Sequence, residues 1–348
     1  MSTANQRNKA AAAAYWAAVD CARDLSAMQA VAEQHLAPDV RWQGFAPVGD
    51  CSGPDALARD YLAPLAGAFD GAFDGLVRDT HILMGGESSG RADGGPDGAM
   101  WVGATGYLCG TQRHDLWDIP ARGTPLRLRW GEFLEFDAQG RIIRIQTIID
   151  VIDWLEQIGL SPLPPSRGTP FVYPSPTGLN GVLHAPQDSA YSDDTLAFAR
   201  RFIFDGLNAY DQDDLGSMDM AGFFHPNLKW YGPGGIGACL SFADFQTLHQ
   251  APYLRAFPDR QVQDLDNLIA EGDFVGASSL PGVIMTHSGP YLGHQPSGAQ
   301  VGVNGIDFWR REGTQFTENW VFVDMLHLFG QFGIDLMARV RHMAGADL

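Results

Sequence analysis

The stretch ENWVFVDMLHLFGQFG, residues 318–333, has an aspartate that is followed by a glutamine after seven residues and by a glycine after nine. The stretch RIQTIIDVIDWLEQIG, residues 144–159, repeats this spacing from Asp150 in place of Asp324. Both stretches begin with a strand-like run and continue as an apolar segment. One such match could arise by chance, so its extent along the chain decides what it means.

The match extends over most of the chain. Equivalent pairs occur in the same order: Pro38 and Pro226, Trp42 and Trp230, Cys51 and Cys239, Pro64 and Pro252, Phe69 and Phe257, Gly123 and Gly298, Glu132 and Asp307. Conserved order and spacing at this scale are the signature of an internal repeat. The sequence therefore predicts two copies of one domain, each of roughly 150 residues.

The expected boundaries follow from composition. Residues 161–190 hold seven of the 21 prolines, a density that excludes a helix or a central strand. This segment is predicted to be an extended linker between a first domain, 1–160, and a second, 191–348. The first copy is longer by a glycine-rich insertion at 85–99, which is expected to be a flexible surface loop.

Composition excludes several classes of protein. The chain has 45% apolar and 18% charged residues, and no apolar run approaches the roughly 18 residues of a membrane span. A net charge of -18 repels phosphate backbones and anionic membranes, which argues against nucleic-acid or membrane partners. Four scattered cysteines fit neither a disulfide framework nor a zinc site. We expect a cytoplasmic protein without a metal ion, and its alanine- and arginine-rich composition suggests a bacterial source.

Each copy begins with helices and continues with long strand-like runs. The alanine-rich stretch near the N-terminus imitates a secretory leader, but Asp20, Arg23 and Asp24 follow at once, which favours a first helix. In the second copy a helix is expected from Ser192 as its N-cap. Helices followed by a meander of strands indicate an α+β fold with a curved antiparallel sheet.

An ordered set of motifs in the second copy resembles a known family. These motifs are THSGPYLGHQPSG, GVNGIDFWRREG, FTENWVFVD and LFGQFG. The set resembles the SnoaL-like polyketide cyclases of the nuclear-transport-factor-two-like superfamily, which includes ketosteroid isomerase. The resemblance implies two tandem cone-shaped α+β barrels, each with N-terminal helices packed on the sheet around an apolar pocket. It also implies acid–base chemistry without metal or cofactor, although members range from cyclases to non-catalytic modules.

Two carboxylates stand out on the strands. A period-two reading of the first copy places one row on one face: Leu126, Leu128, Trp130, Glu132, Leu134 and Phe136. Asp307 takes the position of Glu132 in the second copy, in a row with Val301, Val303 and Trp309. Burying an unpaired carboxylate is costly, so each is a candidate general base, and the alternative is a structural acid with a fixed partner. The resemblance places the family's catalytic aspartate at Asp307.

His287 is the expected proton donor or shuttle beside Asp307. It begins the HSG motif that the resemblance points to, and the alternative is a hydrogen-bonded strand histidine. The first copy has Gln112 at this position, with His114 two residues later, which argues against the same chemistry in both pockets. Other predicted substrate contacts are Trp320, Trp230, Tyr231, His249, Tyr253 and Phe322 in the second copy, and Gln112 and Trp130 in the first.

The sequence favours a cofactor-independent enzyme of the cyclase, isomerase or lyase type, acting mainly in the second domain. Its expected substrate is a small hydrophobic carbonyl compound, such as a polyketide or a steroid-like molecule. Two alternatives stay open: a hydrolase that uses the same carboxylate to activate water, and a non-catalytic ligand-binding or scaffold protein. The duplication also predicts an intramolecular pseudo-dimer, and it leaves open a further pairing of whole chains.

Overall fold

Helices precede long strands in both halves of the chain. The computed structural model describes residues 3–69, 75–95, 97–211 and 214–346. The first half contains α1 (Thr3–Cys21), α2 (Leu25–His35), β1 (Leu36–Gln43), β2 (Cys51–Ser52), α3 (Pro54–Leu57), η1 (Ala58–Leu62), α4 (Ala63–Ala68), β3 (Val77–Glu87), β4 (Met100–Thr111), β5 (Pro125–Phe136), β6 (Ile142–Ile149) and α5 (Val151–Gln157). The alanine-rich N-terminal stretch thus forms α1, as the sequence predicts.

The second half follows the same plan. It contains α6 (Ser189–Arg200), η2 (Arg201–Gly206), η3 (Leu207–Ala209), η4 (Leu215–Met218), α7 (Met220–Phe223), β7 (Phe224–Tyr231), β8 (Ala238–Cys239), α8 (Phe242–Asp244), η5 (Phe245–Gln250), α9 (Ala251–Ala256), β9 (Gln261–Val262), β10 (Asn267–Glu271), β11 (Phe274–Thr286), β12 (Gln300–Glu312), β13 (Gln315–Val323), α10 (Met325–Gln331) and α11 (Leu336–Ala346). The cap of α6 is Asp188, whose side chain accepts from the Tyr191 N–H. The predicted cap, Ser192, lies inside the helix instead, where its hydroxyl donates to the Asp188 carbonyl.

The two sheets share one strand order. The first reads β2-β1-β6-β5-β4-β3, and the second reads β8-β7-β13-β12-β11-β10 in the same direction, with β9 added beside β11. Each has a parallel pair at the same place, β1 with β6 and β7 with β13, and antiparallel neighbours elsewhere. The α+β class is confirmed. In the described part of the chain neither sheet closes on itself, so the strands form curved open sheets rather than complete barrels.

The repeated aspartate starts a helix in each half. Asp150 caps α5 by accepting from the Asp153 N–H at 3.0 Å, and Asp324 caps α10 by accepting from the His327 N–H at 3.0 Å. Such caps satisfy backbone donors that the first turn of a helix leaves free. The glycine nine residues after each aspartate has a positive φ, 76° and 81°, which only glycine adopts without strain.

The repeated glutamine ties each helix back to its sheet. The Gln157 amide bonds both the N–H and the carbonyl of Arg127, at 3.0 and 2.9 Å. The Gln331 amide does the same to Gly302, at 2.9 and 2.8 Å. The spacing that reveals the repeat in the sequence is therefore set by the docking of each helix onto its sheet.

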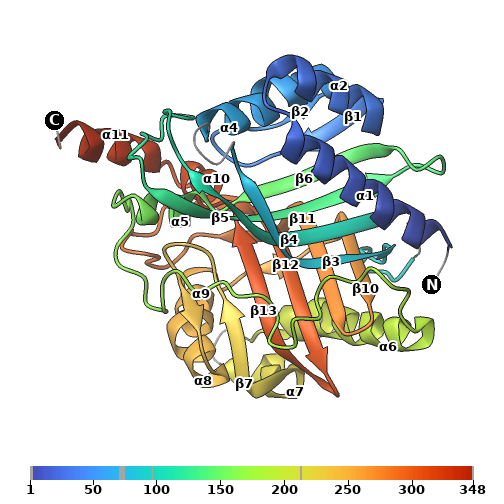
Figure 1. Cartoon of the computed structure of the whole chain (residues 1–348). Helices are drawn as coiled ribbons and strands as arrows, with labels where there is room; N and C mark the ends of the chain where they lie inside the picture. The colour runs from blue at the N-terminus through green and yellow to red at the C-terminus, as the bar shows by residue number, and fades with distance from the viewer. Residues whose placement is uncertain (1–2, 70–74, 96, 212–213, 347–348) are drawn as a thin grey trace.

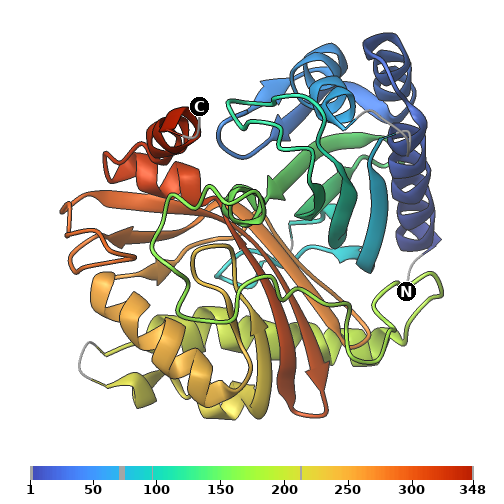
Figure 2. The ribbon, with the colours of Figure 1, turned by 60° about the vertical axis from the view of Figure 1, so that its left-hand side comes forward.

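The two sheets meet in the middle of the molecule, with helices on the outer sides of both (Figures 1 and 2). Phe133 and Phe308, which hold equivalent positions, stack on each other with ring centroids 5.2 Å apart. Gly131 allows this close approach, because a Cβ there would lie 2.9 Å from the Phe322 ring. Both phenylalanines of the stack are fully buried, so the larger apolar core continues from one half into the other.

Equivalent residues also exchange polar contacts across the halves. Besides capping its own helix, Asp150 accepts from the Gly234 N–H of the second half at 2.8 Å. Asp324 accepts from the Ala46 N–H of the first half, also at 2.8 Å. Ala46 and Gly234 each lie four residues after the repeated tryptophan. The two contacts are reciprocal, as across an isologous interface.

The proline-rich segment runs in extended form over both halves, with no helix or strand between residues 158 and 188. Tyr173 is buried against the first half, where its hydroxyl lies 2.6 Å from that of Thr105. The next residue, Pro174, accepts from Trp320 Nε1 of the second half at 2.8 Å. The segment therefore binds to both sheets as a strap.

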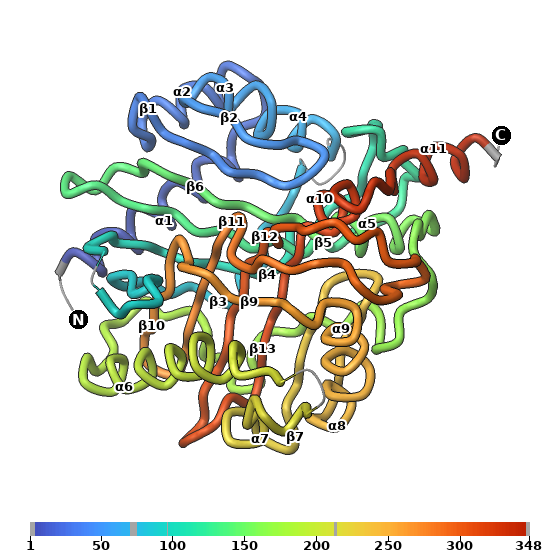
Figure 3. The backbone as a smooth tube through the Cα atoms, turned by 180° about the vertical axis from the view of Figure 1, so that it is seen from behind, coloured from blue at the N-terminus to red at the C-terminus, as the bar shows by residue number. Residues whose placement is uncertain are grey.

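The glycine-rich insertion also contacts the second half. β3 extends into it, and the Ser89 N–H then donates to the Leu268 carbonyl at 2.9 Å, while Gly90 accepts from the Leu265 N–H at 2.9 Å. β3 and β10 accordingly lie side by side (Figure 3). Residue 96 of the insertion lies outside the described residues. Within those residues, none of the helices combines the length and apolar character of a bilayer-spanning helix.

Candidate active site in the second half

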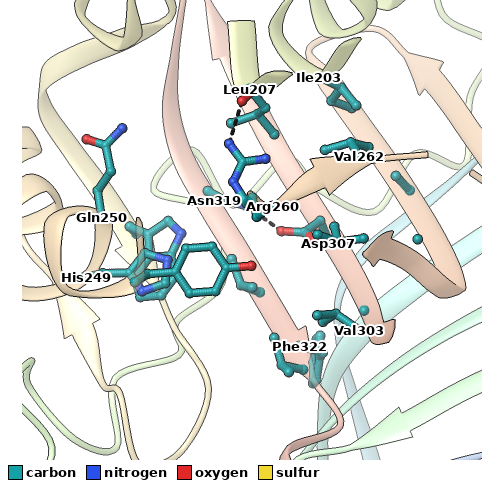
Figure 4. A pocket seen from close by; sticks show the side chains of 18 of the residues that line it. Ile203, Leu207, His249, Gln250, Arg260, Val262, Val303, Asp307, Asn319 and Phe322 are labelled. Atoms are coloured by element: carbon teal, nitrogen blue, oxygen red, sulfur yellow. Dashed lines mark hydrogen bonds between the residues drawn. The ribbon is translucent and has the colours of Figure 1, made fainter. Parts of the chain in front are cut away.

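A cavity of about 220 Å³ lies between the helices and the inner face of the second sheet. Its walls are mainly apolar side chains, and few polar groups face it. Those drawn and labelled in Figure 4 are His249, Gln250, Arg260, Asp307 and Asn319. An enclosed apolar space with a few convergent polar groups is the usual form of a small-molecule site.

Asp307 is the one carboxylate among the described residues that line this cavity. The alternation of β12 sends Val303, Asp307 and Trp309 to the same face, as the period-two reading predicts. Its single hydrogen bond is a long one, 3.4 Å from Asn319 Nδ2 on the neighbouring strand β13 (Figure 4). The Asp307 side chain is half-buried, because protein surrounds it on most sides and its carboxylate borders the cavity.

The pKa of Asp307 follows from these surroundings. Removal of the carboxylate from water raises its pKa to about 7, and the weak hydrogen bond from Asn319 opposes the shift only in part. No cation forms an ion pair with Asp307 among the described residues. A carboxylate with a pKa near neutrality exchanges protons readily at physiological pH, which is what a general base requires.

An aromatic stack forms one wall of the cavity. His249 lies against Trp230 with ring centroids 4.2 Å apart, and against Tyr253 at 5.4 Å. Burial, together with the nearby charge of Arg260, lowers the pKa of His249 to about 3. The imidazole is therefore neutral at physiological pH and offers a flat face, while the Tyr253 hydroxyl donates only to the Met285 sulfur at 3.2 Å.

The structure does not bring His287 to this cavity. Its side chain is fully buried, stacked on Phe332 at 4.1 Å, and its Nδ1 accepts from the Ser297 N–H at 3.2 Å. It is absent from the described lining of the cavity that holds Asp307. The alternative that the sequence left open, a hydrogen-bonded structural histidine, matches this geometry, because the ring of His287 is tied to the backbone of Ser297.

The other predicted contacts divide into two groups. Trp230, His249, Tyr253 and Phe322 line the cavity. Trp320 and Tyr231 do not, since both belong to the contact with the strap and its surroundings: the Trp320 N–H donates to Pro174, and Tyr231 packs on Trp320 at 5.4 Å.

The equivalent carboxylate of the first half is held differently. Glu132 accepts from Trp16 Nε1 and from Thr147 Oγ1, both at 2.6 Å, and it is only 6% exposed. Burial raises its pKa, against the lowering effect of Arg78 and of both hydrogen bonds. The space beside it is only about 40 Å³, and Trp130 lines it with its ring 4.4 Å from the Arg78 guanidinium.

Gln112, the counterpart of His287, has a structural role. Its amide donates to the carbonyls of His114 and Ile119 and accepts from Trp154 Nε1, each at 3.1 Å. The side chain is 1% exposed and lies outside the small pocket of the first half. All of its hydrogen-bonding atoms are thus used to hold a loop.

Comparison with known proteins bears on the second half. Residues 217–332 match the family model described as SnoaL-like polyketide cyclase. This segment of the second half is similar to that family. No curated protein matches the chain.

Solved structures match about one half of the chain each. AclR from Streptomyces galilaeus is 24% identical, with a TM-score of 0.33, and the match covers 41% of this chain and 97% of that one. A SnoaL-like protein from Jannaschia sp. CCS1 is 21% identical over 42% of this chain and 97% of its own, with a TM-score of 0.36. A protein of the polyketide cyclase type from Xanthomonas campestris pv. campestris is 22% identical over 45% and 99%, with a TM-score of 0.33.

Sequence reasoning missed several polar residues of the cavity, namely Gln250, Arg260, Ser278, Ser279 and Asn319. Asn319 could have been found, because the alternation of β13 puts it on one face with Val321 and Val323, and all three line the cavity. Arg260 stands just before the two-residue strand β9, where periodicity gives no signal. Within the described residues, no group of three or more His, Cys, Asp or Glu is placed to hold a metal ion.

Proposed function

We propose that the second half is a cofactor-independent acid–base enzyme of the cyclase, isomerase or lyase type, in which Asp307 is the general base. Its substrate is a small hydrophobic carbonyl compound. The observation that carries the proposal is the carboxylate itself: it borders an apolar cavity, has one weak hydrogen bond and has a pKa of about 7. The SnoaL-like match of residues 217–332 supports the reaction class.

The proposed reaction begins with proton transfer from carbon. Asp307 takes the proton next to the substrate carbonyl, and the electron pair of that C–H bond moves to the carbonyl oxygen to form an enolate. Burial raises the pKa of Tyr253, so its hydroxyl stays protonated and can donate to that oxygen in place of the weak Met285 acceptor. The enolate then takes back a proton at another carbon, or attacks a second carbonyl to close a ring.

Hydrogen–deuterium exchange tests the first step without knowledge of the natural substrate. A bicyclic ketone such as 2-tetralone is incubated in D2O, and NMR follows deuterium uptake next to the carbonyl. Wild type should accelerate uptake, and Asp307→Asn should reduce the acceleration by a factor of about 10² to 10⁴, the usual contribution of a positioned base. Glu132→Gln is the matched control and should leave the rate unchanged. Equal acceleration by wild type and Asp307→Asn would favour the non-catalytic binding protein.

We also infer that the two halves are tandem cone-shaped domains that pair as an intramolecular pseudo-dimer. The shared strand order, the Phe133–Phe308 stack and the reciprocal contacts of Asp150 and Asp324 support this arrangement. Leu179 in the strap is 84% exposed, so limited chymotrypsin digestion should cut there. The two fragments should still elute together in size-exclusion chromatography, and separate elution would contradict the pairing. A bacterial, cytoplasmic origin remains part of this proposal.

A further inference from the structure

Arg260 is a buried cation without an acidic partner. Its side chain follows α9, lines the cavity and is 9% exposed. One of its N–H groups donates to the Leu207 carbonyl at 2.5 Å, as Figure 4 shows. In the described part of the chain no carboxylate forms an ion pair with the guanidinium, and the Leu207 carbonyl is its one hydrogen-bond partner there.

Arg129 in the first half shows how this protein otherwise treats a buried arginine. It is 2% exposed, and it pairs with Asp153 at 2.9 Å and with Asp150 at 3.5 Å. It also donates to the Gly232 carbonyl at 2.9 Å. A guanidinium has five N–H donors, and burying it without an anion costs free energy. The contrast indicates that the anion for Arg260 comes from outside the chain.

Arg260 and Asp307 share the cavity without neutralising each other. The Asp307 carboxylate bonds to Asn319 and not to Arg260, and the nearby Tyr253 feels both charges: Arg260 lowers the pKa of its hydroxyl, and Asp307 raises it. The cavity therefore has a cationic group and an ionisable acid at separate places on an apolar wall. Arg260 is also a local exception in a chain of net charge -18.

We propose that the cavity binds an apolar ligand that carries one carboxylate group, held by the guanidinium of Arg260. Arginine is suited to this role, because its planar N–H groups match the two oxygens of a carboxylate. The apolar part of the ligand packs on Trp230 and His249. The carbon next to its carbonyl group faces Asp307. This last placement rests on the proposed function, whereas the carboxylate site rests on Arg260 alone.

A pair of probes of equal shape tests the proposal. 2-Naphthoate carries the carboxylate, and 2-acetylnaphthalene has a neutral methyl ketone at the same position. Isothermal titration calorimetry at pH 8 should show naphthoate binding at least tenfold tighter to wild type. Arg260→Met should remove this preference by weakening naphthoate tenfold or more, with the affinity for the ketone unchanged. Arg255→Met is the matched control, because it removes a positive charge from exposed Arg255 on α9, the helix just before Arg260.

Further variants keep the test decisive. Arg260→Lys retains the charge and should keep part of the preference, which covers the case that the methionine variant fails to fold. Asp307→Asn removes a negative charge from the cavity and should tighten naphthoate binding. The proposal is overturned if naphthoate binds no tighter than the ketone, if it does not bind at all, or if a folded Arg260→Met keeps the preference. The two proposals can fail separately. If deuterium exchange of the ketone does not depend on Asp307 but the preference for naphthoate is intact, only the proposed function is contradicted.

Discussion

The interiors of the two halves start from the same plan and end differently. In both, the repeated tryptophan stacks on a ring from the helix opposite: Trp42 on Tyr61 at 4.6 Å, and Trp230 on His249 at 4.2 Å. In the first half Trp117 stacks on Tyr61 in turn, and the free space shrinks to about 40 Å³. In the second half the space beside the repeated tryptophan is about 220 Å³. The same strand order therefore encloses a cavity in one half and a nearly filled core in the other.

The equivalent carboxylates differ in the same way. Glu132 has two strong donors at 2.6 Å, so its charge is fixed in place and its oxygens are occupied. Asp307 has one donor at 3.4 Å and open space beside it. Glu132 and Asp307 are both buried because they hold equivalent positions on their strands. The side chains around each carboxylate determine whether it can take a proton from a ligand.

The pH dependence of exchange should show the largest effect. Because burial raises the pKa of Asp307 to about 7, the anionic base is lost as the pH falls below that value. The exchange rate on 2-tetralone should drop about tenfold per pH unit, or on the order of 10³ between pH 7 and pH 4, and level off above pH 8. A rate that is flat across this range would show that Asp307 is not the base.

The raised pKa of Asp307 should also make stability depend on pH, but stability should fall with rising pH whereas the exchange rate rises. The folded pKa of Asp307 lies above its unfolded value of 3.8, so the folded state binds the extra proton between the two values. Stability that this group contributes is present below pH 4 and is lost as the pH rises towards 7. Denaturant titrations of wild type and Asp307→Asn should therefore diverge in favour of the variant across this range.

Truncation of the equivalent rings, Tyr61 and His249, should destabilise the two halves by different amounts. Tyr61→Ala opens a hole in a filled core and should lower the free energy of unfolding by about 3–5 kcal/mol, as for other large aromatic side chains. His249→Ala only enlarges an existing cavity, so its cost should be clearly smaller. Urea denaturation of both variants measures the difference. Equal losses would mean that the second cavity is already packed in solution.

The two carboxylates should respond differently to amide substitution. Glu132→Gln places an NH2 group against either the Trp16 or the Thr147 donor and should cost about 1–3 kcal/mol. Asp307→Asn removes an awkward buried charge and should be neutral or stabilising. Thermal melting at pH 8 checks both expectations. A destabilised Asp307→Asn would instead identify a structural acid.

The smallest effects are expected at the reciprocal aspartates. Asp150→Ala and Asp324→Ala each remove a helix cap and one contact across the halves, for a loss of about 1–2 kcal/mol. Asp324 is the cleaner test, since Asp150 also lies 3.5 Å from Arg129. Similar losses in the two variants would support the equivalence of the halves, and a loss confined to one would argue against it.

The fold could be predicted from the sequence because its signals are local and repeated. Strand alternation places Asp307 on one face with Val303 and Trp309. The order of helices followed by strands in each copy predicts the α+β class. The prediction of Ser192 as the cap of α6 is wrong, because serine and aspartate both cap helices and the sequence alone does not say at which of them the helix begins. A motif suggests that His287 acts with Asp307, whereas in the structure the His287 ring bonds to the Ser297 N–H and stacks on Phe332.

Contacts that depend on the far side of the fold were beyond sequence reasoning. Nothing near Arg260 in the chain predicts that its guanidinium lines the cavity beside Leu207, because α9 and the segment after η2 meet only in the folded protein. The difference in cavity size was equally hidden. The stack of Trp117 on Tyr61 in the first half, for example, joins two residues that are distant in sequence and meet only in the folded protein.

The stack of Phe133 on Phe308 places two equivalent residues face to face at the centre of the molecule. In a symmetric dimer of separate chains, one gene change would alter both partners, so a ring that fills one pocket would fill the other as well. The single chain removes that restriction, because each half can acquire substitutions of its own. One copy can then specialise as a scaffold that supports its neighbour, while the other keeps the open cavity and is free to vary its ligand.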